Sequence, residues 1–203
     1  MPIDMSARPR RIMIPGNPPI DLWDLRHRYL IGVPGERPIP RREFSQINEI
    51  AIHHDASWFD AGDNDYNGTT FDEDIERMDA DYRAANDRLN LNPRRQPYDL
   101  YASPNGRLYY VKDSRIIGAH VEGHNTRAMA VCGFGDFTSV WPSLVGLAVY
   151  GGGCAVIWRG LWRKVPITGH RYFPAQSTVC PGNVFRPGWE ALVELVAQRF
   201  AGF

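Results

Sequence analysis

The sequence predicts a single α/β domain with a central mixed β-sheet flanked by helices, preceded by an irregular N-terminal arm. Short apolar or aromatic runs of strand length alternate with longer segments of helical periodicity, as is typical of α/β proteins. The chain has 203 residues, of which 43% are hydrophobic, enough for one well-buried core and few for two. We expect the arm to occupy residues 1–45 and the domain to occupy residues 46–203.

The predicted arm is rich in proline and arginine and has no helical or strand periodicity of useful length. We expect an extended segment that packs along the domain through Trp23, Leu25 and Tyr29. Because the N-terminus lacks the apolar core of a secretory signal, we expect cytoplasmic synthesis without export by the general secretory route.

The first predicted strand of the domain, residues 47–54, is buried and ends in two adjacent histidines, His53 and His54. Neighbouring side chains of a strand point to opposite faces of the sheet. The two imidazoles should therefore not serve one site.

An acidic loop leads into the first predicted helix. Thr70 and Glu73 form a capping box at the helix start, and apolar residues recur at steps of three and four up to Leu89. The loop and first turn, from Asp63 to Asp74, also match part of a calcium-loop template. The last position holds Asp where Glu is preferred, so an acidic approach to the helix cap is the alternative interpretation.

Four further segments complete the predicted fold. Residues 98–111 contain two aromatic-rich strands around Pro-Asn-Gly, a strong hairpin signal. A strand is expected near residues 128–134, and a strand or loop at residues 165–173. Residues 187–203 have the pattern of an amphipathic C-terminal helix.

Residues 140–158 carry no charge over 19 positions and are long enough to cross a membrane. They also contain three consecutive glycines, a proline and two tryptophans, and are only moderately apolar. These features favour a buried helix, so we expect no stable membrane insertion.

The charge and cysteine content exclude some classes of protein. Lys plus Arg and Asp plus Glu each number 23, which argues against a general nucleic-acid binder. The three cysteines do not indicate a disulfide framework and fit a reducing compartment.

Three places in the chain can supply zinc ligands: the His53–His54 pair, His170 in "ITGHRYF" and Cys180 in "STVCPG". A catalytic zinc site uses three protein ligands and keeps one open position. A loop can bring His170 and Cys180 together, and a strand end is a common place for a site in α/β folds. Each residue alone also has an ordinary structural interpretation.

Four motifs occur in the order "IAIHHDAS", "PYDLYASPNGRLYYV", "IGAHVEGHNT" and "ITGHRYFPAQSTVCPG". Together they resemble the zinc-dependent N-acetylmuramoyl-L-alanine amidases of type 2, the superfamily of phage lysozyme-type amidases and peptidoglycan recognition proteins. The resemblance covers about residues 47–185. It implies hydrolysis of the amide bond between N-acetylmuramic acid and L-alanine in peptidoglycan, with zinc as cofactor.

The resemblance assigns the zinc ligands to His53, His170 and Cys180. Strand alternation then directs His54 to the other face, as a packing or supporting residue. For catalysis the resemblance points to Tyr98 and Thr178, which would stabilise or relay protons around the oxyanion of the amide.

Two departures from the family's pattern limit these assignments. Asp99 and Leu100 follow Tyr98 where the family often has His and Phe. Cys132 stands where another branch places a glutamate, so we nominate no general base.

The motif "GAHVEGHNT" is expected at the groove that binds the muramoyl-peptide. His120, His124 and Asn125 are its candidate contacts. The alternative is that these polar side chains only stabilise a turn.

The sequence therefore leads us to expect a monomeric zinc amidase, bacteriolytic and antimicrobial, of a phage or prophage endolysin. It would remain in the host cytoplasm until lysis and then act on the cell wall. A cytoplasmic wall-recycling amidase is an alternative, as is a non-catalytic module that binds peptidoglycan. Non-catalytic relatives typically lose a zinc ligand, whereas all three ligands are present here.

Overall fold

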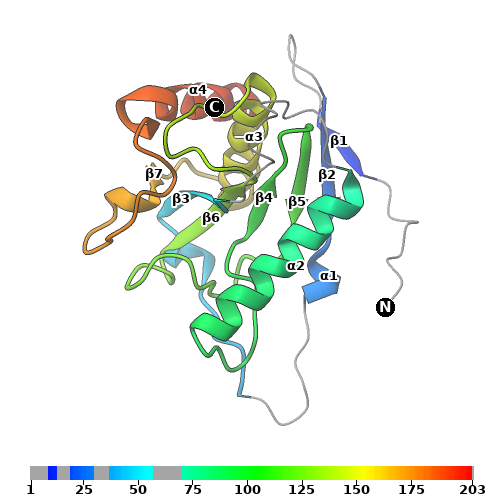
Figure 1. The fold of residues 1–203 in the computed structure, drawn as a ribbon, viewed down its shortest axis with the longest axis vertical. Coiled ribbons are helices and arrows are strands. Elements are labelled where there is room, and N and C mark those ends of the chain that lie inside the picture. The colour runs from blue at the N-terminus through cyan, green and yellow to red at the C-terminus, as the bar shows by residue number, and fades with distance from the viewer. Residues whose placement is uncertain (1–8, 13–18, 30–36, 57–69, 203) are drawn as a thin grey trace.

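The computed structural model describes residues 9–12, 19–29, 37–56 and 70–202. They form an α/β domain in which helices flank a seven-stranded mixed sheet (Figure 1), as predicted. The strands are β1 (Arg10–Ile12), β2 (Ile20–Asp24), β3 (Glu49–His54), β4 (Leu100–Ala102), β5 (Arg107–Tyr110), β6 (Ala128–Gly133) and β7 (Ile167–Gly169). The helices are α1 (Arg26–Tyr29), α2 (Phe71–Arg88), α3 (Leu144–Leu161) and α4 (Glu190–Ala201), with short helical turns η1 (Phe44–Gln46), η2 (His170–Tyr172) and η3 (Phe185–Trp189).

The strand order is β1-β2-β5-β4-β6-β3-β7. β3 pairs in parallel with β6 and β7, and β6 pairs in parallel with β4. β4 and β5 form the predicted antiparallel hairpin. The carboxyl ends of the four strands β3, β4, β6 and β7 therefore lie at one edge of the sheet, where β3 ends in its histidine pair.

Residues 1–45 show no strand periodicity of useful length, yet they contribute two strands to the sheet. β2 runs parallel to β5, in register from Asp21 opposite Arg107 to Asp24 opposite Tyr110, and β1 pairs with β2 at the sheet edge. The β5 partner of β2 lies more than 80 residues away in sequence, so local periodicity could not reveal this parallel pairing. The domain boundary at residue 46 stays a prediction.

Helices cover both faces of the sheet (Figure 1). On one face Ile50, Ile52 and Val131 pack with α3 and α4 in the larger apolar cluster. On the other face Tyr101 and Cys132 pack against the apolar stripe of α2. The alternation of side chains along β3 and β6 divides these two layers.

The long uncharged segment forms α3, which Ser143 caps by accepting a hydrogen bond from the Gly146 N–H. Within the described ranges α3 is the one helix long and apolar enough to span a membrane, and 67% of it is buried inside the protein. It packs between the sheet and α4. Its apolar character is therefore that of a core helix.

The start of α2 has the predicted capping box, in which the Glu73 N–H donates to Thr70 Oγ1 and the Thr70 N–H donates to Glu73 Oε2. Most of the calcium-like loop lies outside the described residues. Its last member, Asp74, is buried in α2 and accepts hydrogen bonds from Arg107 and Tyr109. Asp74 thus already has a structural role in the packing of α2 on the sheet.

Candidate metal centre

Three side chains that could bind a metal meet at the carboxyl edge of the sheet. The ligand atoms of His53, His170 and Cys180 all lie within 4.8 Å of one another. The Cys180 Sγ lies 3.7 Å from His53 Nδ1, and the rings of His53 and His170 are 4.5 Å apart between centroids. These are the three residues that the sequence predicted as zinc ligands.

Strand pairing explains how His53 and His170 come together. β3 and β7 are parallel neighbours, with Ile52 opposite Gly169. Each strand then continues by one residue into its histidine. The two imidazoles therefore lie side by side although 117 positions separate them in the sequence.

A tight turn holds Cys180 above the end of β3. The Arg171 N–H donates to the Cys180 carbonyl, and the Cys180 N–H donates to Thr178 Oγ1. The thiol itself accepts a hydrogen bond from the His54 N–H, at 3.3 Å. Hydrogen bonds to His54 at the end of β3 and to Arg171 and Thr178 therefore hold Cys180 in place.

Burial controls the charge of the three groups. It lowers the pKa of His53 and His170 and raises the pKa of Cys180 to about 12. Without a cation, both imidazoles are neutral and the thiol is protonated. Two neutral imidazoles and one cysteine form a donor set that suits zinc, and three protein ligands leave one position for water or substrate. The residues present therefore fit a zinc ion.

His54 points to the opposite side of β3. Its Nδ1 accepts a hydrogen bond of 2.9 Å from the Phe137 N–H, and Asp136 lies 3.6 Å away. The carbonyl of His53, on that same side, accepts a hydrogen bond from the Tyr150 hydroxyl. The His54 imidazole thus stabilises the loop after β6 through its hydrogen bond with Phe137.

Tyr98, one of the two predicted catalytic residues, lies beside the cluster, with its ring centroid 5.0 Å from that of His53. Burial raises the pKa of Tyr98 well above its ordinary value, so the phenol stays protonated at neutral pH. Thr178, the other, is half-buried and holds Cys180 through its hydroxyl oxygen. Both residues adjoin the candidate metal ligands.

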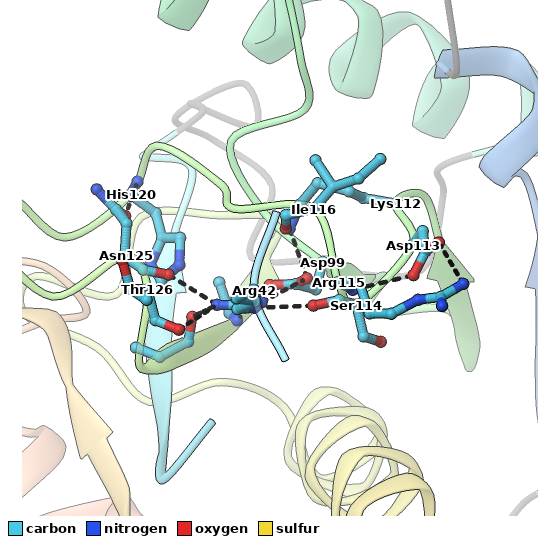
Figure 2. A network of polar contacts seen from close by, with 12 residues as sticks. Arg42, Asp99, Lys112, Asp113, Ser114, Arg115, Ile116, His120, Asn125 and Thr126 are labelled. Carbon is cyan, nitrogen blue, oxygen red and sulfur yellow. Dashed lines mark hydrogen bonds and ion pairs between the residues drawn. The ribbon is translucent and has the colours of Figure 1, made fainter. Parts of the chain in front are cut away.

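The three predicted substrate contacts have different surroundings. His120 is 8% exposed, and its Nδ1 lies 3.2 Å from His53 Nε2. Asn125 Oδ1 accepts hydrogen bonds from the N–H groups of His120 and Val121, so it stabilises the turn (Figure 2). His124 packs edge-on against Phe173, with 5.2 Å between ring centroids.

Sequence reasoning missed one polar residue of the site. Gln176 lies in the loop between His170 and Cys180, and its Oε1 is 3.2 Å from His170 Nε2. Its position in the loop between two predicted zinc ligands is the one signal for it in the sequence.

The fold is similar to that of solved peptidoglycan recognition proteins (PGRPs) and of solved N-acetylmuramoyl-L-alanine amidases. PGRP-SA of the bumblebee gives a TM-score of 0.64 at 16% identity, over 81% of this chain and 90% of that chain. PGRP-LB of Drosophila gives 0.61 at 16% identity, over 79% and 88%. The N-acetylmuramoyl-L-alanine amidase LysC of Clostridium intestinale gives 0.56 at 16% identity, over 84% and 93%. No protein-family model and no curated protein matches the chain.

Proposed function

We propose that this protein is a zinc-dependent N-acetylmuramoyl-L-alanine amidase of type 2. It would hydrolyse the amide bond between N-acetylmuramic acid and the first L-alanine of the peptidoglycan stem peptide. The observation that carries the proposal is the convergence of His53, His170 and Cys180 within 4.8 Å at the carboxyl edge of the sheet. The similar fold of a solved amidase supports it.

The three converging residues would hold the zinc ion. Bound zinc would lower the pKa of a coordinated water towards neutrality and polarise the amide carbonyl. Cys180 must lose its proton when the ion binds, and the His54 N–H that points at its sulfur stabilises the thiolate.

Tyr98 is the proposed donor to the oxygen that becomes negative as the amide is attacked. Because burial keeps its phenol protonated, Tyr98 can donate a hydrogen bond to this oxygen without losing its proton. Thr178 accepts from the Cys180 N–H, which leaves its own hydroxyl proton free to donate to substrate. Both side chains are thus suited to stabilise the oxyanion.

A second candidate function is binding of peptidoglycan without cleavage. Several solved structures of similar fold are peptidoglycan recognition proteins, and one is described in complex with a muramyl pentapeptide. The complete set of zinc ligands favours the amidase, because loss of a ligand is expected in a module that only binds.

Bacterial sacculi provide the direct test. Purified protein is incubated with them, and released stem peptides with an L-alanine amino terminus are quantified. We expect release that zinc restores after chelation and that Cys180→Ser abolishes. Equal release in the presence of chelator would overturn the zinc mechanism. Binding without release under any metal condition would favour the recognition module.

For the biological setting we propose a phage or prophage endolysin. It would remain in the host cytoplasm until lysis and then act on the cell wall as a monomer. One structure of similar fold is an endolysin amidase, LysCS of Clostridium intestinale. A wall-recycling amidase would share the chemistry. Lysis of cells on external addition or on co-expression with a membrane-permeabilising protein would favour the endolysin.

A further inference from the structure

Each imidazole of the candidate metal centre presents its second nitrogen to a polar side chain. His170 Nε2 lies 3.2 Å from Gln176 Oε1, and His53 Nε2 lies 3.2 Å from His120 Nδ1. A neutral imidazole carries one proton. The group that receives this proton therefore decides which nitrogen is free to bind a metal.

The orientation of the Gln176 amide follows from its other contacts. Its Nε2 donates to the Glu122 carbonyl at 3.1 Å and to the Pro174 carbonyl at 3.2 Å. The atom that faces His170 is thus the amide oxygen, which can only accept. His170 must carry its proton on Nε2, and its Nδ1 is the nitrogen available to a metal.

The proton of His53 follows from the position of Cys180. Its Nδ1 lies 3.7 Å from the Cys180 Sγ, so Nδ1 is the nitrogen that can bind the same ion as the thiolate. The proton then sits on Nε2 and is donated to His120 Nδ1. Both imidazoles can thus bind the metal through Nδ1, and each donates a hydrogen bond from Nε2 to a neighbouring side chain.

The turn that carries His120 is held by a buried network (Figure 2). The Asn125 side chain accepts from the His120 N–H, and the Asn125 carbonyl accepts from Arg42 at 2.7 Å. Arg42 is buried and also contacts Asp99, which accepts from the Lys112 ammonium at 2.5 Å. Arg42 therefore ties this turn to Asp99 and, through Asp99, to Lys112.

A hydrogen bond also joins the loop that carries Gln176 to the turn that carries His120. The Gln176 Nε2 donates to the carbonyl of Glu122, two residues after His120. The loop with the acceptor for His170 is therefore tied to the turn with the acceptor for His53. Gln176 is half-buried, and His120 is buried.

We propose that Gln176 and His120 are positioning residues, which hold the imidazoles of His170 and His53 with Nδ1 directed to the metal. The inference rests on the proposed function, since it assumes that the site binds zinc. Partners of this kind fix the tautomer and ring orientation of a metal ligand, and their loss weakens metal binding about 10- to 100-fold.

The test is zinc affinity, measured on metal-stripped full-length protein by competition with a chromophoric chelator. Gln176→Leu removes the acceptor and should weaken binding about 10- to 100-fold. Gln176→Glu keeps an acceptor but loses both donated hydrogen bonds, and should bind within about threefold of wild type. Gln198→Leu makes the same chemical change on α4, away from the site, and should have no effect.

A role of Gln176 in loop structure alone predicts a different result. Both Gln176 variants would then weaken zinc binding equally, since both lose the bond to Glu122. That result would overturn the inference, as would unchanged affinity in Gln176→Leu. For His120 the matched pair is His120→Leu, which should weaken binding, and His120→Asn, which keeps an acceptor near the Nδ1 position and should restore it.

A second measurement needs no variant. Long-range ¹H–¹⁵N spectra of the zinc-loaded wild type with labelled histidine should show two imidazoles bound through Nδ1 and protonated at Nε2. Coordination through Nε2 in either ring would overturn the inference while leaving the proposed amidase intact. Absence of zinc binding by the wild type would overturn both.

Discussion

At the scale of single residues, β3 places two consecutive histidines in different surroundings. The ring of His53 faces His170 and Cys180, whereas the ring of His54 accepts a hydrogen bond from the Phe137 N–H in a buried site. Alternation along the strand separates the two rings. Only one of them is therefore placed to bind the metal.

We predict opposite effects for alanine at these two positions. His53→Ala should reduce bound zinc to less than about a tenth of an equivalent, because one of three protein ligands is lost. His54→Ala should keep about one equivalent but lower the free energy of unfolding by about 1–3 kcal/mol, since the Phe137 N–H stays buried without an acceptor. Metal analysis and urea unfolding measure both. Equal zinc loss in the two variants would contradict the assignment.

A second residue-scale prediction concerns Asp81 on α2. Its Oδ2 is buried and has no hydrogen-bond partner in the described part of the chain. Burial first, and then the charge of Asp55, raise the pKa of Asp81 to about 7 from 3.8. Between these values the folded protein keeps a proton that the unfolded chain has released. The resulting stability is present below pH 4 and is lost as the pH rises through 7.

Asp81→Asn removes this ionisation. At pH 8 the variant should exceed wild type in free energy of unfolding by on the order of 2–4 kcal/mol, and at pH 4 the two should be nearly equal. The measurement is urea unfolding at both pH values. Asp87→Asn, an exposed change on the same helix, should show no such difference. A gain that does not depend on pH would refute the explanation.

At the scale of elements, α3 and α4 approach closely because Gly151 has no side chain. A Cβ there would lie 2.4 Å from Val196 Cγ1 and 3.1 Å from the Ala197 backbone nitrogen. Gly160, nine residues further along the same helix, has open space within 4 Å of its Cβ position. A substitution at Gly151 therefore tests the packing of α3 on α4, whereas the same substitution at Gly160 tests helix propensity alone.

We predict opposite signs for the same substitution at these two sites. Gly151→Ala should lower the free energy of unfolding by about 1–3 kcal/mol, since α4 must move away. Gly160→Ala should raise it by about 0.5–1 kcal/mol, because alanine favours the helix and meets no neighbour. Thermal and urea unfolding give both values. Stabilisation by Gly151→Ala would show that the helices are not in close contact.

The elements also differ in how well sequence predicts them. α2 and α4, the β4–β5 hairpin, and strands β3 and β6 follow from signals within each segment, such as the Thr70 capping box. β2 could not be predicted, because its pairing with β5 depends on residues more than 80 positions away. Gln176 was missed for a similar reason, since its role appears only once its loop folds against His170.

At the scale of the whole molecule, the candidate site joins two distant parts of the chain. His53 ends β3, whereas His170 and Cys180 come from the segment after β7. The unfolded chain cannot hold these three side chains together. A metal that binds them should therefore favour the folded state.

Zinc should raise the melting temperature in proportion to the logarithm of its free concentration. At a hundred times the dissociation constant it adds about 2.7 kcal/mol. For a chain of this size that corresponds to a rise of about 5–10 °C. The measurement is calorimetry of metal-stripped protein with buffered zinc. Cys180→Ser should lose this shift. Cys154→Ser, in buried α3, should melt lower yet keep it, because the thiol of Cys154 lies outside the cluster. An equal shift in Cys180→Ser would place the stabilising zinc elsewhere.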